Sequence, residues 1–241
     1  MNDIEAVGAR ISRRAYQNTG LTEKQRSQLD QAVKRCNETS GLTISLWFDR
    51  PELFGGFLKS YGLLAGVRNL FVMAGPKNDP HLAEKIGYYG ERLVLEATKL
   101  DLDTCWVGGS YDRKAVRSII ADADTALAVI AFGNAGKEYS PRERFIRLLA
   151  HRRKTNRDQF FLSDGTEPAW FQAAIDLVVK APSAVNQQPV VFTVENGVIQ
   201  SGLRIHNAAA MVDLGIAKLH FGLACPTGFW AWGENGIFTY R

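Results

Sequence analysis

The sequence of 241 residues predicts an α+β fold in which mixed or antiparallel sheets are surrounded by helices. Three observations support this class. Hydrophobic residues make up 46% of the chain and charged residues 22%, as in an ordinary globular protein. Apolar residues follow helical spacing in some segments and strand spacing in others. The order helix, strand, long helix, strand occurs twice, on either side of a break near residues 136–165.

The first half begins with a helix after Thr22, because Gln25 follows in the register of a capping box. An alternating strand over residues 42–48 comes next, and then a glycine-rich aromatic segment, 54–66, that reads as a loop with a short helix. Apolar spacing predicts the other elements: strands over 70–74, 104–107 and 126–132, a long helix over 82–100 and a short helix over 113–120.

The second half starts at Pro168, which suits the first turn of a helix that runs to Lys180. Asn196 and Gly197 are a strong signal for the turn of a β-hairpin. The remaining elements follow from apolar spacing: hairpin strands over 190–194 and 198–201, a long helix over 208–223 and strands over 229–232 and 237–240.

The two long helices and the strands after them can be overlaid, with residues 88–106 on 212–230 and Trp106 opposite Trp230. Either one structural unit is repeated, or two amphipathic helices are alike by chance. With a repeat, residues 1–241 form one intimate unit of two halves, about 1–150 and 151–241. Such a chain imitates a two-fold dimer within one polypeptide. We expect a monomeric pseudo-dimer, while pairing of chains into a homodimer stays open.

Composition and sequence patterns argue against several classes of protein. No apolar run approaches the roughly 20 residues that span a bilayer, so no membrane partner is expected. The N-terminal residues lack the basic and then apolar pattern of a secretory signal, which makes a cytoplasmic location the default expectation. Three scattered cysteines and four dispersed histidines indicate neither a disulfide framework nor a metal site.

Basic residues gather between positions 137 and 157, although the net charge of the chain is only +4. They are Lys137, Arg142, Arg144, Arg147, Arg152, Arg153, Lys154 and Arg157. Such a cluster can bind nucleic acid, bind a phosphate-bearing cofactor, or be a solvated surface. The sequence shows neither interleaved aromatics nor a nucleic-acid module, so the last two interpretations remain.

The segment 181–189 reads Ala-Pro-Ser-Ala-Val-Asn-Gln-Gln-Pro and lies between a helical run and a strand. Short polar side chains at a helix end can hydrogen-bond a flat heterocycle without burying a net charge. The segment resembles the Ala-Pro-Ser-x-x-Asn-x-Gln-Pro-Trp signature of the FMN-dependent nitroreductase family, with Val190 in place of Trp. The resemblance implies a nitroreductase-like fold. It also implies cofactor-binding roles for Pro182, Ser183, Asn186 and Gln188.

Two other segments resemble the same family. Residues 11–17 resemble its Arg-Arg-Ser-x-Arg motif, and the adjacent Arg13 and Arg14 offer bidentate donors to a phosphate. Ala15 and Gln17 stand where that motif has serine and a second basic residue. Residues 87–109 resemble its central helix followed by Gly-Leu-Gly-Thr-Cys-Trp-x-Gly-Gly. The resemblance places Val107, Gly108 and Gly109 beside the reactive N5 of the flavin, where the glycines donate backbone hydrogen bonds.

The strand over 128–133 and the basic residues after it resemble the last core strand of the family and its phosphate-contacting tail. Arg152, Arg153 and Lys154 fit that tail best, with Arg142 and Arg144 as rivals. Nearer the N-terminus, Lys59 and Tyr61 are candidates for the pyrimidine edge of the flavin. The aromatic side chains of their loop, Phe54, Phe57 and Tyr61, either cover the flavin or form ordinary core.

The order of these motifs points to a particular branch. In ordinary nitroreductases the Pro-Ser-x-x-Asn segment follows the arginines closely, whereas here it lies in the second half. From about residue 11 to residue 221 the chain resembles the tandem "putative TM nitroreductase" branch. The resemblance implies one complete site, with the arginine pair from the first half and Ser183 and Asn186 from the second.

The implied function is an oxidoreductase that passes electrons through FMN, from NAD(P)H to an electron-poor small molecule such as a nitroaromatic or quinone. The flavin carries the chemistry, so no catalytic side chain is expected. No G-x-G-x-x-G follows a strand, which argues against a stable Rossmann dinucleotide site. The replacements at Ala15, Gln17 and Val190 motivate an alternative, a non-catalytic flavin-binding or redox-sensing protein.

Overall fold

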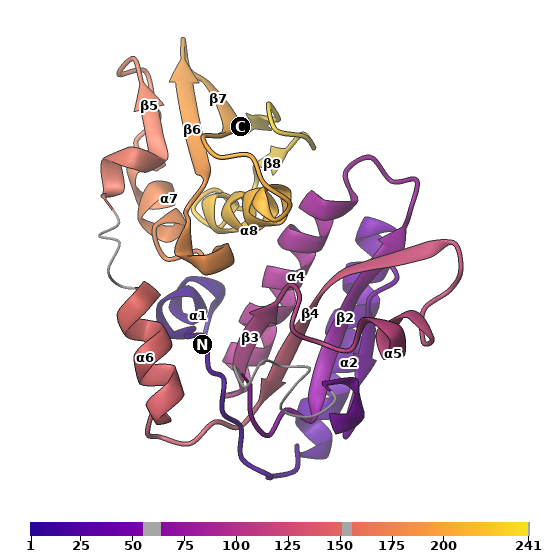
Figure 1. Ribbon diagram of the computed structural model, residues 1–241. Helices are drawn as coiled ribbons and strands as arrows, with labels where there is room; N and C mark the ends of the chain where they lie inside the picture. Colours follow the sequence, from indigo (N-terminus) through magenta and orange to yellow (C-terminus); the bar gives the residue numbers. More distant parts are fainter. Residues whose placement is uncertain (55–63, 151–155, 241) are drawn as a thin grey trace.

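The structure, a computed structural model, describes residues 1–54, 64–150 and 156–240. It contains two sheets, each with a long helix, α4 or α8, against one face (Figure 1). These two helices pack against each other, so the layers run sheet, helix, helix, sheet. The predicted α+β class with mixed and antiparallel sheets is therefore confirmed.

The first sheet is antiparallel throughout, in the order β1-β2-β4-β3. Its strands are β1 (Ser45–Trp47), β2 (Asn69–Pro76), β3 (Asp103–Val107) and β4 (Asp124–Gly133). Its helices are α2 (Glu23–Ser40), α4 (Leu82–Lys99) and the short α5 (Arg113–Arg117). Side chains alternate along a strand, so Phe71 and Met73 pack with α2 and α4, while Leu70 and Val72 face the side of α5.

The second sheet has the order β5-β6-β7-β9-β8, and apart from the parallel pair β5 and β6 it is antiparallel. Its strands are β5 (Phe161–Ser163), β6 (Val190–Glu195), β7 (Val198–Leu203), β8 (Phe229–Trp230) and β9 (Ile237–Thr239). Its helices are α7 (Phe171–Val178) and α8 (Ala210–Gly222). Stacked and edge-on aromatic rings fill the core between sheet and helices, centred on Phe192, Phe221 and Trp230.

The two sheets share a connection pattern. Without β5, the second sheet has the order β6-β7-β9-β8, which matches β1-β2-β4-β3 strand for strand. In each sheet a long helix, α4 or α8, joins the second strand to the third. The repeated order of helices and strands expected from the sequence is thus present in the structure.

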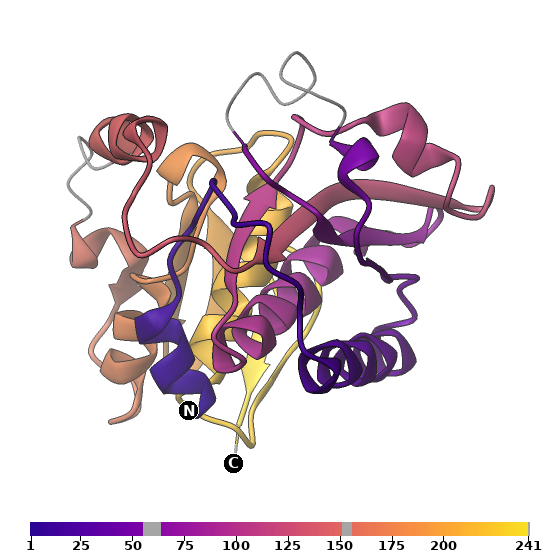
Figure 2. The same cartoon turned by 90° about the horizontal axis from the view of Figure 1, so that it is seen from below.

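The helices α4 and α8 lie side by side between the sheets (Figures 1 and 2) and approach most closely at two glycines. A Cβ atom on Gly87 would lie 1.9 Å from the carbonyl oxygen of Val212, and one on Gly215 would lie 1.9 Å from that of Glu84. The contact is thus reciprocal, with Glu84 as the counterpart of Val212. The overlay drawn from the sequence sets Tyr88 opposite Val212 and is therefore displaced by one helical turn at the crossing.

Local sequence patterns predicted where several helices, strands and turns begin or end. The capping box of Thr22 and Gln25 is present at the start of α2. Asn196 and Gly197 have φ values of 50° and 76°, as the predicted hairpin turn requires. The predicted strand 229–232 is shorter in the structure, ending at Trp230. The carbonyls of Ala231 and Gly233 turn toward the buried ammonium of Lys218.

Several elements were not anticipated from the sequence. They are α1 (Asp3–Ala9), α6 (Pro141–Ala150), β5 and three 3₁₀ turns, Pro51–Leu53, Arg157–Phe160 and Ala184–Asn186. Residues 12–16 run beside the edge of the first sheet, where Ser12 bridges Thr104 of β3. In the part of the chain that the structure describes, no helix combines the length and apolar character needed to span a bilayer.

Candidate functional site

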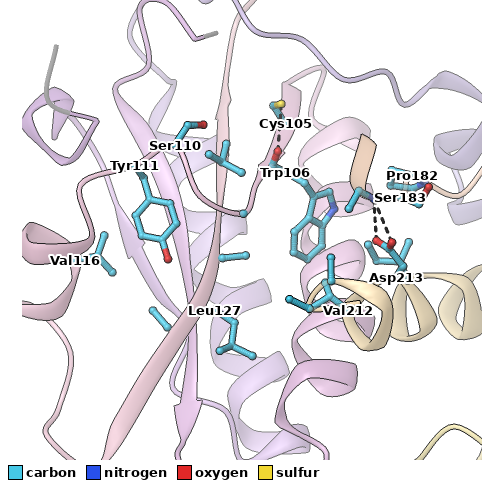
Figure 3. A pocket seen from close by; sticks show the side chains of 18 of the residues that line it. Cys105, Trp106, Ser110, Tyr111, Val116, Leu127, Pro182, Ser183, Val212 and Asp213 are labelled. Atoms are coloured by element: carbon cyan, nitrogen blue, oxygen red, sulfur yellow. Dashed lines mark hydrogen bonds between the residues drawn. The ribbon is translucent and has the colours of Figure 1, made fainter. Parts of the chain in front are cut away.

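A pocket of about 760 Å³ opens at the edge of the first sheet, within the usual size range of ligand sites (Figure 3). Segments far apart in the sequence form its walls. They are the N-terminal run at Ser12 and Arg14, the end of β3 with the loop into α5, part of β4, the turn 182–185 and the start of α8. Arg14 and the Pro182 turn thus line one cavity, although they lie far apart in the sequence.

The N-terminal run is fixed by the buried carboxylate of Glu143 in α6. Its Oε1 accepts hydrogen bonds from Arg13 Nε at 3.0 Å and from the backbone N–H groups of Arg14 at 2.7 Å and Ala15 at 3.3 Å. Its Oε2 accepts one from Ser140 N at 2.8 Å. Burial opposes the charge, but these hydrogen bonds outweigh it and lower the pKa of Glu143 to about 2.

Arg13 does not line the pocket, although the sequence resemblance assigned it to the phosphate. Its guanidinium pairs with Glu143, donates to the carbonyl of Glu138 at 3.0 Å and stacks over the ring of Tyr139. The residue is 4% exposed. A cation so placed balances the buried Glu143 and fastens α6 to the N-terminal run.

Arg14 is the member of the pair that lines the pocket. It is partly exposed, and within the described residues its guanidinium forms no hydrogen bond or ion pair. The Glu143 bond to its backbone N–H fixes where the chain passes, so the side chain extends from an anchored position. It can therefore offer a planar, permanently charged donor to an anion without first losing a protein partner.

The end of β3 supplies the next wall. Val107 and Gly108 line the pocket, whereas the neighbouring Gly109 does not. The Cβ position of Gly108 faces open space. The indole of Trp106 also lines the cavity and donates from Nε1 to Glu91 Oε2 at 2.9 Å, while Glu91 Oε1 lies 3.0 Å from His220 Nε2. This buried contact between α4 and α8 holds the indole at the wall.

The turn after α7 presents Pro182 and Ser183 to the pocket (Figure 3). Asn186 and Gln188 do not line it. The amide of Gln188 instead donates to Ala181 O at 3.0 Å and Asn186 Oδ1 at 3.1 Å, which ties the two ends of the turn together. The side chains of Asn186 and Gln188 thus stabilise the turn and do not face the pocket.

The same turn carries backbone strain. Val185, Asn186 and Gln188 have φ values of 46°, 54° and 50°, in the left-handed region that non-glycine residues rarely adopt. For the β-branched Val185 this conformation costs on the order of 1–3 kcal/mol. Val185 is 81% exposed and lines the pocket, so its own packing does not repay that cost. Strain of this kind clusters at functional sites.

Asp213 of α8 lines the pocket and was not singled out in the sequence. It is 4% exposed, and its carboxylate accepts from Ala184 N at 3.0 and 3.2 Å (Figure 3). Burial raises the pKa of Asp213 to about 7, and the Ala184 hydrogen bond offsets only part of this. A carboxylate inside a largely apolar helical run was the available signal.

Replacing Asp213 with asparagine should flatten part of the pH dependence of stability. The folded-state pKa of Asp213 lies above its unfolded value near 4, so wild type loses stability as pH rises from about 4 to about 7. Asparagine keeps an acceptor for Ala184 N without this loss. Relative to wild type, urea unfolding of Asp213→Asn should give a free energy that increases by a few kcal/mol over that range. The control Asp30→Asn, on the exposed face of α2, should follow wild type; a parallel Asp213→Asn profile would contradict the assignment.

The other residues that the resemblance assigned to the cofactor lie elsewhere. Ala15 and Gln17 do not line the pocket, and Gln17 N bonds to Asn134 O. The rival cation Arg144 pairs with Glu138 at the surface, and Arg142 also lies outside the lining. Five candidates fall outside the described residues: Lys59, Tyr61, Arg152, Arg153 and Lys154. Polar residues that line the pocket without having been assigned a role include Ser12, Ser110, Tyr111, Arg113 and Arg117.

Comparison with solved structures identifies the class of fold. A "putative nitroreductase" from Thermotoga maritima MSB8 is similar with a TM-score of 0.64 and 19% identity, covering 99% of this chain and 92% of that one. A Bacteroides fragilis nitroreductase with bound FMN gives 0.46 and 16%, covering 58% and 92%. An FMN-dependent nitroreductase from Clostridium difficile R20291 gives 0.47 and 14%, covering 64% and 98%. The similarity to the Thermotoga maritima structure shows that the fold is that of a nitroreductase.

The family follows from the sequence match. The model of the "Putative TM nitroreductase" family matches residues 2–225, and the chain belongs to that family. A search of curated proteins gave no match. The resemblance noted from the motifs is therefore confirmed.

Proposed function

We propose that the protein is an FMN-dependent oxidoreductase that takes electrons from NAD(P)H and passes them to an electron-poor acceptor such as a nitroaromatic or quinone. One observation carries the proposal: a single pocket collects Arg14, the Val107–Gly108 strand end and the Pro182–Ser183 turn. These residues belong to three of the motifs by which the sequence resembles flavin-binding nitroreductases. Membership of the nitroreductase family supports the reaction class.

The pocket fits FMN in its chemistry. Apolar side chains from β3 and α8, namely Val107, Val212 and Ile216, line the pocket and can contact an isoalloxazine ring. Arg14 provides a cation for the phosphate that no described residue pairs with. The hydroxyls of Ser12 and Ser183 add neutral hydrogen-bonding groups. The size of the cavity leaves room for a flat second ligand as well.

Bound FMN would supply the electron transfer, and the chain would bind, orient and shield it. Arg14 would hold the phosphate, since its position is set by the Glu143 hydrogen bond to its backbone. The open side of Gly108 allows close approach of a ligand to the backbone. The indole of Trp106, held by its hydrogen bond to Glu91, would shield one wall of the pocket from water. Asp213 holds the Pro182 turn in place through Ala184.

We also propose that the chain is a monomeric pseudo-dimer with one complete site. The matching strand orders and the reciprocal contact of Gly87 and Gly215 support a fused pair of half-units. Light scattering combined with a flavin count should give a monomer with one FMN per chain. A homodimer, or two flavins per chain, would contradict this arrangement.

Arg14→Gln should weaken FMN binding about tenfold or more, because it removes a charge-assisted hydrogen bond to the phosphate. The measurement is quenching of flavin fluorescence as apoprotein is titrated into FMN. Arg26→Gln serves as the control, since Arg26 pairs with Asp49 at the surface and does not line the pocket. Wild-type affinity in Arg14→Gln would refute the phosphate role.

The alternative, a non-catalytic flavin-binding or redox-sensing protein, was motivated by Ala15, Gln17 and Val190. None of the three lines the pocket, and Val190 is 3% exposed in the second core, so these replacements remove no group from the pocket wall. Spectroscopy separates the two functions. Addition of NAD(P)H should bleach the visible flavin absorption, and an electron-poor acceptor should restore it. A flavin that NAD(P)H does not bleach would favour the alternative.

A further inference from the structure

The pocket extends past Gly108 into a lobe that none of the nitroreductase motifs covers. Ser110, Tyr111 and Arg113 line this part together with Val116 of α5 and Leu127 of β4. Figure 3 places Tyr111 and Val116 at one end of the cavity and Ser183 and Asp213 at the other. The lobe therefore offers separate walls to a second ligand.

Tyr111 is the first sign of what the lobe binds. The residue is 7% exposed and lines the cavity, yet within residues 1–54, 64–150 and 156–240 its hydroxyl has no hydrogen-bond partner. A phenol hydroxyl at a pocket wall that no described protein group engages can donate a hydrogen bond to a ligand acceptor. Burial raises the pKa of Tyr111, although the nearby guanidinium of Arg113 counteracts part of this, and the phenol stays a donor at neutral pH.

Arg113 adds a positive charge beside this phenol. Its Nη2 lies 3.8 Å from where a Cβ on Gly109 would be, so the guanidinium lies next to the Gly108–Gly109 turn. The side chain makes no ion pair or hydrogen bond with any other described residue. Arg117 also lines the lobe, but it binds the carboxylate of Asp122 and three backbone carbonyls, which engage its donors. Arg113 is thus the cation at this end that is available to a ligand.

No acidic side chain of the described pocket lining lies in this lobe. Among the described lining residues the acidic side chain is Asp213, at the end of the cavity that Ser183 forms (Figure 3). An anion beside Arg113 would therefore meet a guanidinium and neutral hydroxyls. The apolar side chains of Val116 and Leu127 line the same space and suit a flat ring. A neutral ring would leave Arg113 without a counter-charge.

We propose that this lobe selects a flat aromatic electron acceptor that carries a carboxylate. Arg113 pairs with the carboxylate, the hydroxyl of Tyr111 donates a hydrogen bond to it, and Val116 and Leu127 contact the ring. The proposal rests on the proposed function in that the ligand is the electron acceptor. It adds the class of acceptor and two residues that determine specificity.

The test compares two acceptors of nearly equal shape, 4-nitrobenzoate and neutral 4-nitrobenzamide. The FMN-loaded wild type should prefer the benzoate in kcat/KM with saturating NAD(P)H. Arg113→Gln should lower this preference about tenfold and Tyr111→Phe about fivefold, as expected for loss of a charge-assisted and a single hydrogen bond. Added salt should reduce the preference of wild type as well. Lys114→Gln is the matched control, because Lys114 is the exposed neighbour on α5 outside the lining, and it should keep the wild-type ratio.

Calorimetric dissociation constants of the same two compounds give a readout that does not need turnover. Tighter binding of 4-nitrobenzoate that Arg113→Gln abolishes would support the lobe even if the protein oxidised no NAD(P)H, in which case the proposed function alone fails. Equal affinity for both compounds in wild type would overturn the acceptor class. Release of FMN by Arg113→Gln would assign the residue to the cofactor and also overturn the proposal. An equal loss with both acceptors, accompanied by a raised KM for NAD(P)H, would assign Arg113 to the electron donor and overturn it too.

Discussion

Gly215→Ala should lower the free energy of unfolding by about 3 kcal/mol or more, because α4 and α8 cannot both keep their positions around an added methyl group. The new Cβ would lie 1.9 Å from the carbonyl oxygen of Glu84 and 2.7 Å from the backbone nitrogen of Tyr88. These are backbone atoms of a packed helix, so relief requires the helices to separate. Separation would also move Val212 and Ile216, the neighbours of Gly215 that line the pocket.

The control for this substitution lies in the same helix. Gly222 ends α8, and a Cβ there would meet no atom within 4 Å. Gly222→Ala should therefore leave stability unchanged or raise it by up to about 1 kcal/mol through helix propensity. Urea unfolding followed by circular dichroism compares the two variants. If Gly215→Ala unfolds at the same urea concentration as Gly222→Ala, the close crossing of α4 and α8 is wrong.

Glu143→Gln should cost about 3–5 kcal/mol near neutral pH, the range for removing one partner of a buried ion pair. The change leaves the buried guanidinium of Arg13 without a counter-charge. It also places an amide N–H₂ opposite N–H donors, such as Ser140 N, that contact carboxylate oxygens in the wild type. It also weakens the anchor of the run that positions Arg14. FMN affinity should consequently fall together with stability.

The pH dependence identifies Glu143 specifically. Its folded-state pKa of about 2 lies below the ordinary value of 4.5, so its contribution is complete above about pH 4.5 and disappears as pH falls toward 2. Wild type and Glu143→Gln should therefore converge in stability at low pH. Glu138→Gln is the control, because the Glu138 carboxylate forms an exposed pair with Arg144 that contributes at most about 1 kcal/mol. A constant difference between wild type and Glu143→Gln across this pH range would contradict the role of the carboxylate.

Elements with a local cause were predictable from the sequence. The capping box at Thr22 and Gln25 and the turn at Asn196 and Gly197 depend on groups within four residues of each other, and both are present. The long helices were also located within a few residues, since their apolar spacing covers several turns. The short α6 was missed, because much of its surface is polar and one inward carboxylate, Glu143, fastens it to a distant segment.

The candidate site, too, was predictable from the sequence only where its features depend on short segments. The pocket lining includes the motif residues Arg14, Val107, Gly108, Pro182 and Ser183. Similarity of short segments was therefore enough to predict several parts of the pocket wall. It was not enough to separate Arg14 from Arg13. Adjacent residues of an extended chain point to opposite sides, and which side meets Glu143 depends on where α6 packs.

By itself, the sequence determined the α+β class, the two similar runs of helices and strands, and the flavin-type motifs, because each is expressed in residue spacing over short distances. The tertiary structure decided which arginine is buried, that Asp213 faces the pocket, and that Tyr111 and Arg113 form a lobe beyond Gly108. These features depend on desolvation and on partners from remote segments. Burial and hydrogen bonding of a charged group are properties of its surroundings, and those surroundings exist only once the two halves pack together.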